Sequence, residues 1–371
     1  MDKTISLIIP TYNECDNIAP LTQRISQVLS GRSYEILFVD DNSADGTAEM
    51  AASLADRYPV KVVVRKDKRG LATAVVDGLS HTSGQTIVVM DADLQHPPEV
   101  IPDLLREIEA GADVVVASRY VKGGGCPDWS LSRRLMSRGA IFLAHLLLPA
   151  TRGVSDPTSG FFAFSRDVVK ESELKPTGYK ILLEVLMMGR HQTAAEAPFV
   201  FGTRGGGQSK LGARQQIDYL KHIFSLMRRR GELARFIRFG IVGLSGVGVN
   251  VGLYWLLTRF AGFTPLDNAA IGNILSGNLA LTISIETSII TNFTLNNFFT
   301  FADRNKKGTA AFLSRLLNFN LICLIGALIQ IGLTNLLAVG FGLYDLFSLV
   351  IAIILAMLWN YVLNNWWTWK Q

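Results

Sequence analysis

The stretch Thr86-Ile87-Val88-Val89-Met90-Asp91-Ala92-Asp93-Leu94-Gln95 joins an apolar segment directly to two carboxylates and an amide. The β-branched run from Thr86 to Met90 predicts a short buried strand. Carboxylates at the exposed end of such a strand repel each other unless a cation neutralises them, and a hard divalent ion with oxygen ligands does so. A solvated turn is the alternative for an Asp-x-Asp sequence, but the position straight after a strand favours a metal site.

Short β-branched runs and helix-like stretches alternate from Ile5 to Ala117. Strands are expected at residues 5–9, 34–39, 60–64, 86–90 and 113–117, and helices at residues 17–29, 45–56, 70–81 and 98–110. Strand then helix, repeated, predicts an α/β fold with a parallel sheet and helices on both faces. Such sheets bind ligands in the crevice at the carboxyl ends of their strands. The acidic segment after Met90 lies at such an end.

Polar residues also follow the first two expected strands, in Pro10-Thr11-Tyr12-Asn13-Glu14 and Val39-Asp40-Asp41-Asn42-Ser43. Both segments should line the same crevice as Asp91, because parallel strands end at a common edge. A carboxylate there accepts hydrogen bonds from a nucleobase or a ribose. Ser, Asp and Asn also favour helix N-caps, and we assign that role, outside the site, to Asn13, Asp16 and Ser43.

The net charge of +5 conceals an uneven distribution along the chain. Residues 1–127 carry 12 basic and 18 acidic side chains, whereas residues 128–238 carry 18 basic and 9 acidic ones. A solvated basic face is one interpretation of this charge. The other is binding of a substrate with several phosphates, because the planar guanidinium of arginine binds phosphate in a bidentate way. The candidate cations are Arg119, Arg133, Arg134, Arg204 and Lys210.

Two stretches of the basic segment are amphipathic. Residues 129–148 combine Arg133 and Arg138 with many leucines, and residues 211–227 combine Arg214 and Lys221 with Ile, Leu and Phe. Such helices lie in the headgroup plane of a membrane and bring a soluble site to a lipid-borne substrate. Packing against the core of the same domain is the alternative, and the sequence does not decide between the two.

The cysteines and histidines indicate no disulfide, no zinc site and no covalent nucleophile. Cys15, Cys126 and Cys323 are odd in number and far apart, without the spacing of metal ligands. No serine or cysteine has an evident histidine partner, and His96 is expected to pack or to form hydrogen bonds rather than to bind metal. A lipid phosphate would itself be an anionic nucleophile near neutral pH, since phosphate monoesters have a second pKa of about 6.

Uncharged stretches near the length that crosses a bilayer, about 20 residues, occur after residue 235. Three are residues 239–258, 316–340 and 346–369, and residues 268–302 supply a fourth that is interrupted only by Glu286. Basic residues flank these stretches almost wholly on one side, with Arg259 as the exception. The asymmetry predicts a multi-pass protein of the cell membrane with both termini and the loop near residue 305 in the cytoplasm. The apolar run at residues 5–9 is too short for a signal-peptide core, so the N-terminal domain is also expected there.

The apolar region repeats internally. Asn292-Phe293-Thr294-Leu295-Asn296-Asn297-Phe298-Phe299-Thr300-Phe301 matches Asn360-Tyr361-Val362-Leu363-Asn364-Asn365-Trp366-Trp367-Thr368-Trp369. Each unit is therefore expected to be a hairpin of two spans, used twice in the same orientation. The aromatic residues suit a membrane interface. The Asn pairs are expected to form hydrogen bonds between helices, with contact to a substrate as the alternative.

Together these motifs resemble those of the dolichol (polyprenol) phosphate mannose synthases of glycosyltransferase family 2. The resemblance is carried by residues 9–14 and 39–43, by Met90-Asp91-Ala92-Asp93-Leu94-Gln95-His96-Pro97-Pro98, by Ser118-Arg119-Tyr120 and by Ser159-Gly160-Phe161-Phe162. It implies a GT-A, Rossmann-like nucleotide-sugar domain over residues 1–210 and an amphipathic interfacial linker helix over residues 211–234. Residues 235–371 resemble the GtrA-like domain, with four transmembrane helices, of the microbial type III form.

The resemblance further implies transfer of mannose from GDP-mannose to a dolichyl or polyprenyl phosphate, inverting at the anomeric carbon, with Mg²⁺ or Mn²⁺ as cofactor. It assigns the nucleoside and its diphosphate to Pro10, Tyr12, Glu14, Val39, Asp41, Asp91, Ala92 and Asp93. It assigns metal binding to Asp91, Asp93 and Gln95. It assigns binding of the donor and acceptor phosphates to Arg119, Arg133, Arg204 and Lys210. The expected catalytic residues are Asp91, Asp93, Arg119 and Arg133.

Two other functions remain open. A related lipid-phosphate glucosyltransferase would use UDP-glucose, and the spacing of the motifs does not identify the hexose. Glu286 suggests a translocase of lipid-linked sugars with an attached transferase, since an ionisable residue at membrane depth is a functional candidate. A processive polysaccharide synthase is disfavoured because no Gln-x-x-Arg-Trp sequence precedes the spans. No nucleic-acid partner is indicated, and the oligomeric state, the acceptor chain length and the preferred metal are left open.

Overall fold

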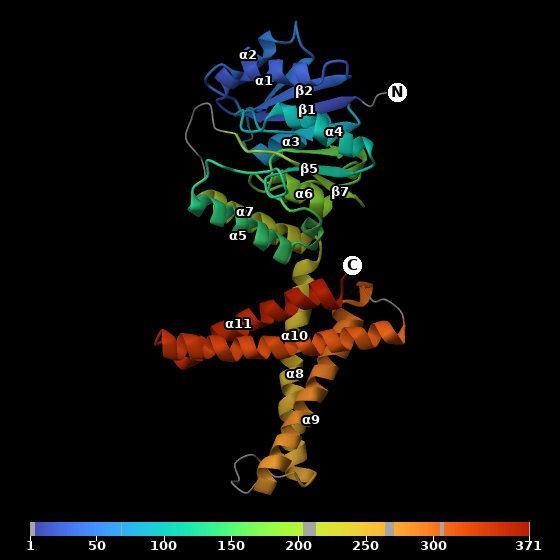
Figure 1. Cartoon of the computed structure of the whole chain (residues 1–371), viewed down its shortest axis with the longest axis vertical. Coiled ribbons are helices and arrows are strands. Elements are labelled where there is room, and N and C mark those ends of the chain that lie inside the picture. Colours follow the sequence, from blue (N-terminus) through green and yellow to red (C-terminus); the bar gives the residue numbers. More distant parts are fainter. Residues whose placement is uncertain (1–3, 68, 203–212, 264–270, 305–307, 371) are drawn as a thin grey trace. The chain divides into compact units, whose positions relative to one another are not determined.

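The computed structural model describes residues 4–67, 69–202, 213–263, 271–304 and 308–370, without the side chains of residues 213–214, 271–278 and 345–346. The chain divides into two compact units, Met1–Arg230 and Gly231–Gln371. In its described residues the first unit contains a seven-stranded sheet covered by helices, and the second consists of helices (Figure 1).

The sheet has the strand order β3-β2-β1-β4-β6-β5-β7. Its strands are β1 (Ile5–Thr11), β2 (Tyr34–Asp40), β3 (Val60–Val64), β4 (Thr86–Val89), β5 (Val114–Ser118), β6 (Phe162–Ser165) and β7 (Ala194–Pro198). All five strands expected from the sequence are present, each within two residues of its expected bounds. The α/β fold class is confirmed.

The five expected strands run parallel to one another, as predicted, whereas β6, which was not among them, runs antiparallel to its neighbours β4 and β5. The chain reaches β6 through the long helix α5 (Leu131–Leu147) and the 3₁₀ turn η2 (Pro149–Gly153), instead of through a crossover that restores the strand direction. Phe162, at the beginning of β6, pairs with Val89 and Val116 near the ends of their strands. The residues that precede β6 therefore lie at the carboxyl edge of the parallel strands, where ligands bind.

Helices cover both faces of the sheet. α1 (Cys15–Val28), α2 (Thr47–Ser53) and α4 (Ile101–Glu109) contribute to one buried apolar cluster, and α3 (Leu71–Ser80) and α6 (Ile181–Met188) contribute to the other. Leu7 and Ile9 belong to the first cluster and Ile8 to the second, because successive strand residues point to opposite faces. The short 3₁₀ helices η1 (Pro98–Val100) and η3 (Arg166–Val168) follow β4 and β6. The helical cover on both faces is confirmed.

The two amphipathic stretches form α5 and α7 (Ala213–Arg229), which contact each other. The hydroxyl of Tyr219 on α7 donates to the carbonyl of Ala140 on α5 at 2.6 Å. α7 buries Ile223 and Leu226 but leaves apolar side chains exposed, as α5 does: Ile217, Leu220 and Phe224 on α7, and Leu131, Leu135, Met136 and Phe142 on α5. Packing on the domain accounts for one face of α7, a second apolar face remains exposed, and its contact with a membrane interface stays a prediction.

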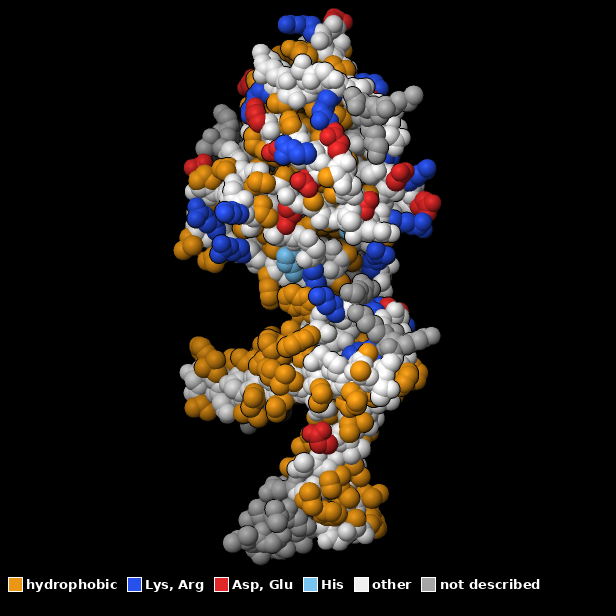
Figure 2. All heavy atoms as spheres, turned by 45° about the vertical axis from the view of Figure 1, so that its right-hand side comes forward, with side chains coloured by type: hydrophobic (Ala, Val, Ile, Leu, Met, Phe, Trp, Pro, Cys, Tyr) orange, Lys and Arg blue, Asp and Glu red, His pale blue; other side chains and the backbone are white. Residues whose placement is uncertain are grey.

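The second unit contains four long helices in its described part: α8 (Glu232–Phe260), α9 (Ile271–Leu295), α10 (Thr309–Asn335) and α11 (Asp345–Leu363). Three helical segments of the described residues are long and apolar enough to cross a membrane: Glu232–Phe260, Thr309–Gly340 and Phe347–Thr368. Exposed hydrophobic side chains gather over this unit (Figure 2). The crossing by α9, which carries the exposed Glu286, stays a prediction.

The internal repeat of the sequence is also a repeat of structure. Each Asn-Asn motif forms a short π-helical turn, η4 (Asn296–Thr300) or η7 (Asn364–Thr368), and the remaining short helices are η5 (Ala302–Arg304) and η6 (Leu336–Gly340). Asn297 accepts a hydrogen bond from the indole of Trp369 at 3.3 Å, and Asn365 accepts one from Arg304. The predicted hydrogen bonding of the Asn pairs between helices is confirmed for these two residues.

Candidate active site

The segment after β4 forms the acidic side of the site. Leu94 has a φ of 62°, a left-handed conformation that is unfavourable for a residue other than glycine. This turn lets the backbone N–H of Gln95 donate to Oδ1 of Asp93 at 3.2 Å. The side-chain Nε2 of Gln95 donates to the carbonyl of Gly202 at 3.1 Å, so the amide is oriented with Oε1 as its second, accepting atom.

Asp91 lies next to a buried histidine. The backbone N–H of Asp91 donates to Nδ1 of His96 at 3.0 Å, and the ring stacks on Phe161 with centroids 5.3 Å apart. Burial lowers the pKa of His96 to about 4, so the ring is neutral near neutral pH. The packing role expected for His96 is confirmed. A Cβ on Gly160 would lie 3.2 Å from Oδ2 of Asp91, so glycine leaves this space to the carboxylate.

The side chains of this segment suit a hard divalent metal ion. Asp91 has 33% of its side chain exposed, whereas Asp93 is buried. Among the described residues, no three Asp, Glu, His or Cys side chains converge as a metal site. The predicted protein ligands are the carboxylates of Asp91 and Asp93 and Oε1 of Gln95, and phosphate oxygens would complete the shell. Such an all-oxygen set is typical of Mg²⁺ or Mn²⁺.

The ends of β1 and β2 carry two further left-handed residues, Asn13 with a φ of 56° and Asn42 with a φ of 58°. Asp41 is buried beside Asn42, and its Oδ1 accepts from Nε of Arg65 at 2.8 Å. Its Oδ2 accepts from the backbone N–H of Gly70 at 2.7 Å. The carboxylate predicted to bind the nucleoside thus also binds Arg65 and the backbone of Gly70.

Tyr12 lies at the same edge, and the guanidinium of Arg69 lies 5.2 Å from the centroid of its ring. This cation–π pair presents a flat surface of the kind on which a nucleobase stacks. Glu14 is the N-cap residue of α1 and accepts a hydrogen bond from Nδ2 of Asn17 at 2.7 Å. Tyr12, Glu14 and Asp41 follow adjacent parallel strands and lie at the same edge of the sheet, and their binding of a nucleoside stays a prediction.

Three of the predicted residues belong to the framework of the sheet. Val39 and Ala92 are buried, and Pro10 pairs with Val39 in the ladder between β1 and β2. A ligand at this edge would meet their backbone atoms rather than polar side chains. Arg204 and Lys210, predicted to bind phosphate, lie outside the described residues.

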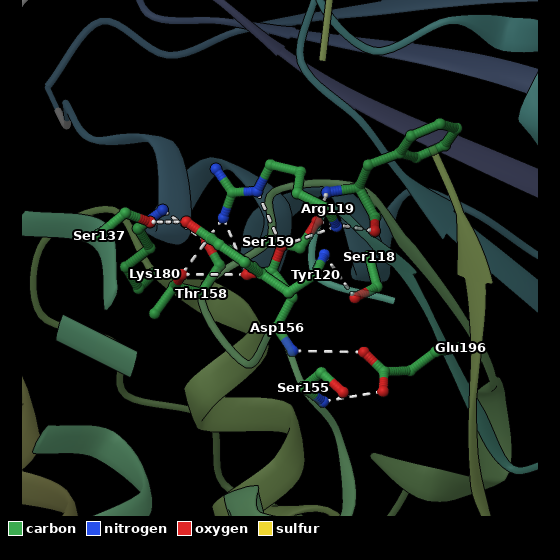
Figure 3. A network of polar contacts seen from close by, with 11 residues as sticks. Ser118, Arg119, Tyr120, Ser137, Ser155, Asp156, Thr158, Ser159, Lys180 and Glu196 are labelled. Atoms are coloured by element: carbon green, nitrogen blue, oxygen red, sulfur yellow. Dashed lines mark hydrogen bonds and ion pairs between the residues drawn. The ribbon is translucent and has the colours of Figure 1, made fainter. Parts of the chain in front are cut away.

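Arg119, just after β5, is fixed by one carboxylate (Figure 3). Its Nε and Nη2 donate to Asp156 at 2.7 and 2.8 Å, and its backbone N–H donates to the same carboxylate at 3.2 Å. Burial raises the pKa of Asp156, but the hydrogen bonds and charge of Arg119 outweigh it, so the pKa lies below its ordinary value. Glu196 on β7 holds this turn in place, since it accepts from the backbone N–H groups of Ser155 and Asp156 at 2.8 and 3.2 Å.

Arg119 and Arg133 share one aromatic ring. Their guanidinium carbons lie 5.1 and 4.1 Å from the centroid of Trp129, so cation–π contacts hold both side chains in one region. The hydroxyl of Tyr120 donates to Oγ of Ser137 at 2.8 Å and ties α5 to the end of β5. The structure therefore brings together two of the four residues predicted to bind phosphate.

Three residues at this edge are not among those predicted from the sequence: Arg69, Asp156 and Lys180. Asp156 belongs to the turn before β6, whose place at the edge depends on the antiparallel direction of that strand. Lys180 directly precedes the apolar run that begins α6, and a lone cation at the start of a buried helix is the signal that indicates it. Arg69 carries no local signal, because it lies in a run of charged residues typical of a surface loop.

Comparison with known proteins identifies both units. Residues 6–172 match the glycosyl transferase family 2 model, and residues 238–369 match the GtrA/DPMS transmembrane domain. The dolichol-phosphate mannosyltransferase of Pyrococcus furiosus is 42% identical over 365 residues, which cover 98% of this chain and 99% of that protein. The chain belongs to the dolichol-phosphate mannosyltransferases.

Other dolichol-phosphate mannosyltransferases match a shorter part of the chain. That of Mycosarcoma maydis is 40% identical over 237 residues, covering 61% of this chain and 79% of that protein. Among solved structures, glucosyl-3-phosphoglycerate synthase from Mycobacterium tuberculosis aligns at 23% identity with a TM-score of 0.48, covering 62% of this chain and 80% of that one. As a dolichol-phosphate mannosyltransferase, the protein is a membrane-bound glycosyltransferase that uses a nucleotide-sugar and dolichyl phosphate, and the predicted family and enzyme class are confirmed.

Proposed function

We propose that the protein transfers mannose from GDP-mannose to a dolichyl or other polyprenyl phosphate, with inversion and with a divalent metal ion. The observation that supports this best is the meeting of opposite charges at one edge of the sheet. The acidic segment of Asp91, Asp93 and Gln95 follows β4, whereas the pair formed by Arg119 and Asp156 lies at the end of β5. Only β6 separates these two strands, so a diphosphate and a second phosphate fit side by side.

Each of the two charged groups would bind a different substrate. A metal ion held by Asp91, Asp93 and Gln95 would neutralise the diphosphate of the departing nucleotide. Asp156 already orients Arg119, and Trp129 already orients Arg133. The binding of a phosphate therefore costs little side-chain conformational entropy. Arg204 and Lys210 would add further phosphate contacts. Tyr12, Glu14 and Asp41 would hold the nucleoside, within the edge formed by Pro10, Val39 and Ala92.

The transfer is a single displacement. An oxygen of the acceptor phosphate attacks the anomeric carbon of the sugar and forms the new carbon–oxygen bond. The bond from that carbon to the diphosphate breaks on the opposite face, its electron pair leaves with GDP, and the configuration inverts. A phosphate monoester is already anionic near pH 7, so no side chain has to remove a proton. The protein therefore contributes mainly position and charge stabilisation.

We place the first unit, both termini and the loop near residue 305 on the cytoplasmic side of the membrane, with α8, α9, α10 and α11 as four spans. The flanking basic residues support this orientation. The exposed apolar side chains of α5 and α7, such as Leu135, Phe142 and Phe224, support contact of these helices with the headgroup layer. Tags at the N-terminus, at Lys306 and at the C-terminus should then be labelled only from the cytoplasm.

The decisive test is a transfer assay with purified protein, one polyprenyl phosphate and a panel of labelled sugar nucleotides. Label should pass to lipid from GDP-mannose with Mg²⁺ or Mn²⁺ present, and transfer should stop in EDTA. Preferred transfer from UDP-glucose would instead establish the glucosyltransferase alternative. Full activity in EDTA would remove the metal from the proposal.

A further inference from the structure

Lys180 directs its ammonium group at the turn that precedes β6 (Figure 3). Its Nζ donates to the carbonyl of Thr158 at 2.5 Å, and the hydroxyl of Thr158 accepts from Nη2 of Arg119 at 3.3 Å. Two cations thus contact one residue of the turn. Asp156, the buried carboxylate beside them, is bound in a bidentate way by Arg119, and no described carboxylate forms an ion pair with Lys180.

The ammonium group is poorly compensated where it lies. It has three donors, and the hydrogen bond to Thr158 uses one of them. Burial, followed by the charge of Arg119, lowers the pKa of Lys180 to about 8, although Asp156 and Asp91 act in the opposite direction. A bound anion would accept hydrogen bonds from the other N–H groups and favour the charged form.

The same turn connects Lys180 to the acidic side of the site. Thr158, which accepts from Lys180, is two residues before Gly160. A Cβ on Gly160 would touch the carboxylate of Asp91 at 3.2 Å, so Gly160 packs directly beside it. Lys180 and Arg119 therefore both bind the turn that also packs against Asp91, so an anion bound by the two cations would lie close to the acidic side of the site.

We propose that Lys180 binds the phosphate of the lipid acceptor together with Arg119, and so places the attacking oxygen beside Asp91. The identity of this acceptor rests on the proposed function, whereas the anion site rests on the contacts of Lys180. The donor diphosphate is bound at the metal side, so the effect of Lys180 falls on the acceptor and not on the nucleotide.

The test uses the full-length protein in detergent, with farnesyl phosphate as a soluble probe and farnesol as the same chain without phosphate. Lys180→Met should raise the Kd for farnesyl phosphate about ten- to a hundredfold, which is the range for loss of a charge-assisted hydrogen bond. The affinities for farnesol and for GDP should stay within about twofold, and the KM for polyprenyl phosphate should rise with the Kd for the probe. Lys180→Arg should retain part of the affinity, because the charge remains.

Lys175→Met is the matched control, since the Lys175 side chain is 63% exposed and should behave as wild type in every measurement. Lys180→Met should not lower Tm, because methionine removes a poorly compensated charge without leaving a cavity. An unchanged Kd for farnesyl phosphate, or an equal loss of GDP and probe binding, would overturn the assignment. Wild-type protein that binds farnesyl phosphate through Lys180 but transfers no mannose would refute the proposed function while leaving the anion site intact.

Discussion

Replacement of Asp156 by alanine should destabilise the first unit strongly, because it leaves the buried guanidinium of Arg119 without its counter-ion. Asp156 is fully buried and accepts from Nε, Nη2 and the backbone N–H of Arg119. Removal of one partner of a buried ion pair costs about 3–5 kcal/mol. A domain of 150–250 residues loses about 2–4 °C of Tm per kcal/mol, so the expected decrease is about 6–20 °C.

The assay is scanning calorimetry of the full-length protein, with hydrogen exchange of the β5 peptides to assign the transition to the first unit. Glu99→Ala is the control, because Glu99 pairs with Arg24 at 2.6 Å but its side chain is 54% exposed. An exposed pair contributes about 0–1 kcal/mol, so Tm should fall by no more than about 4 °C. The double replacement Arg119→Leu with Asp156→Ala should recover part of the loss, since no buried charge is then left unpaired.

A decrease in Tm for Asp156→Ala no larger than that for Glu99→Ala would refute this reasoning. It would mean that Arg119 reaches water or another acceptor when Asp156 is removed, and that its orientation in the site does not depend on the turn before β6. A double variant as unstable as Asp156→Ala would point instead to the backbone hydrogen bonds of the turn.

Four further outcomes are expected. Asp93→Ala should abolish transfer with little change in Tm, since a metal would lose a ligand that the apolar core does not use; retained transfer would contradict the metal assignment. Gly160→Ala should weaken metal-dependent GDP binding, measured by calorimetry, because its Cβ would lie 3.2 Å from the Asp91 carboxylate. Burial raises the pKa of Glu35, but its hydrogen bonds, that from Lys61 first, lower it to about 2 from an ordinary 4.5. The stability this provides is present above pH 4.5 and is lost as pH falls towards 2. Glu35→Gln should therefore make the free energy of unfolding, measured with urea, less dependent on pH between about 4.5 and 2. A chain ending at Arg230 should still bind GDP with metal but should transfer slowly to acceptor in liposomes and faster to acceptor in detergent; loss of GDP binding would show that the second unit helps to build the nucleotide site.

Local patterns were sufficient for much of the architecture. Alternation of β-branched runs with helical stretches predicted the α/β fold, since the period of apolar residues is fixed by secondary structure alone. The carboxyl end of a buried strand likewise located Asp91, Asp93 and Gln95 at one edge. The long apolar stretches and the repeated Asn-Asn motif predicted the helices of the second unit, because bilayer thickness sets a length that is visible in sequence.

The direction of β6 and the pairings at the site had no such local signal. Asp156 meets Arg119 across 37 positions of sequence, and Asp41 meets Arg65 across 24. Both pairs exist because strands distant in sequence end at the same edge, and that depends on how the sheet is ordered rather than on any short run of residues. Lys180 acquires its contact with Thr158 in the same way, since an antiparallel β6 carries the preceding turn to the edge where the acidic segment lies.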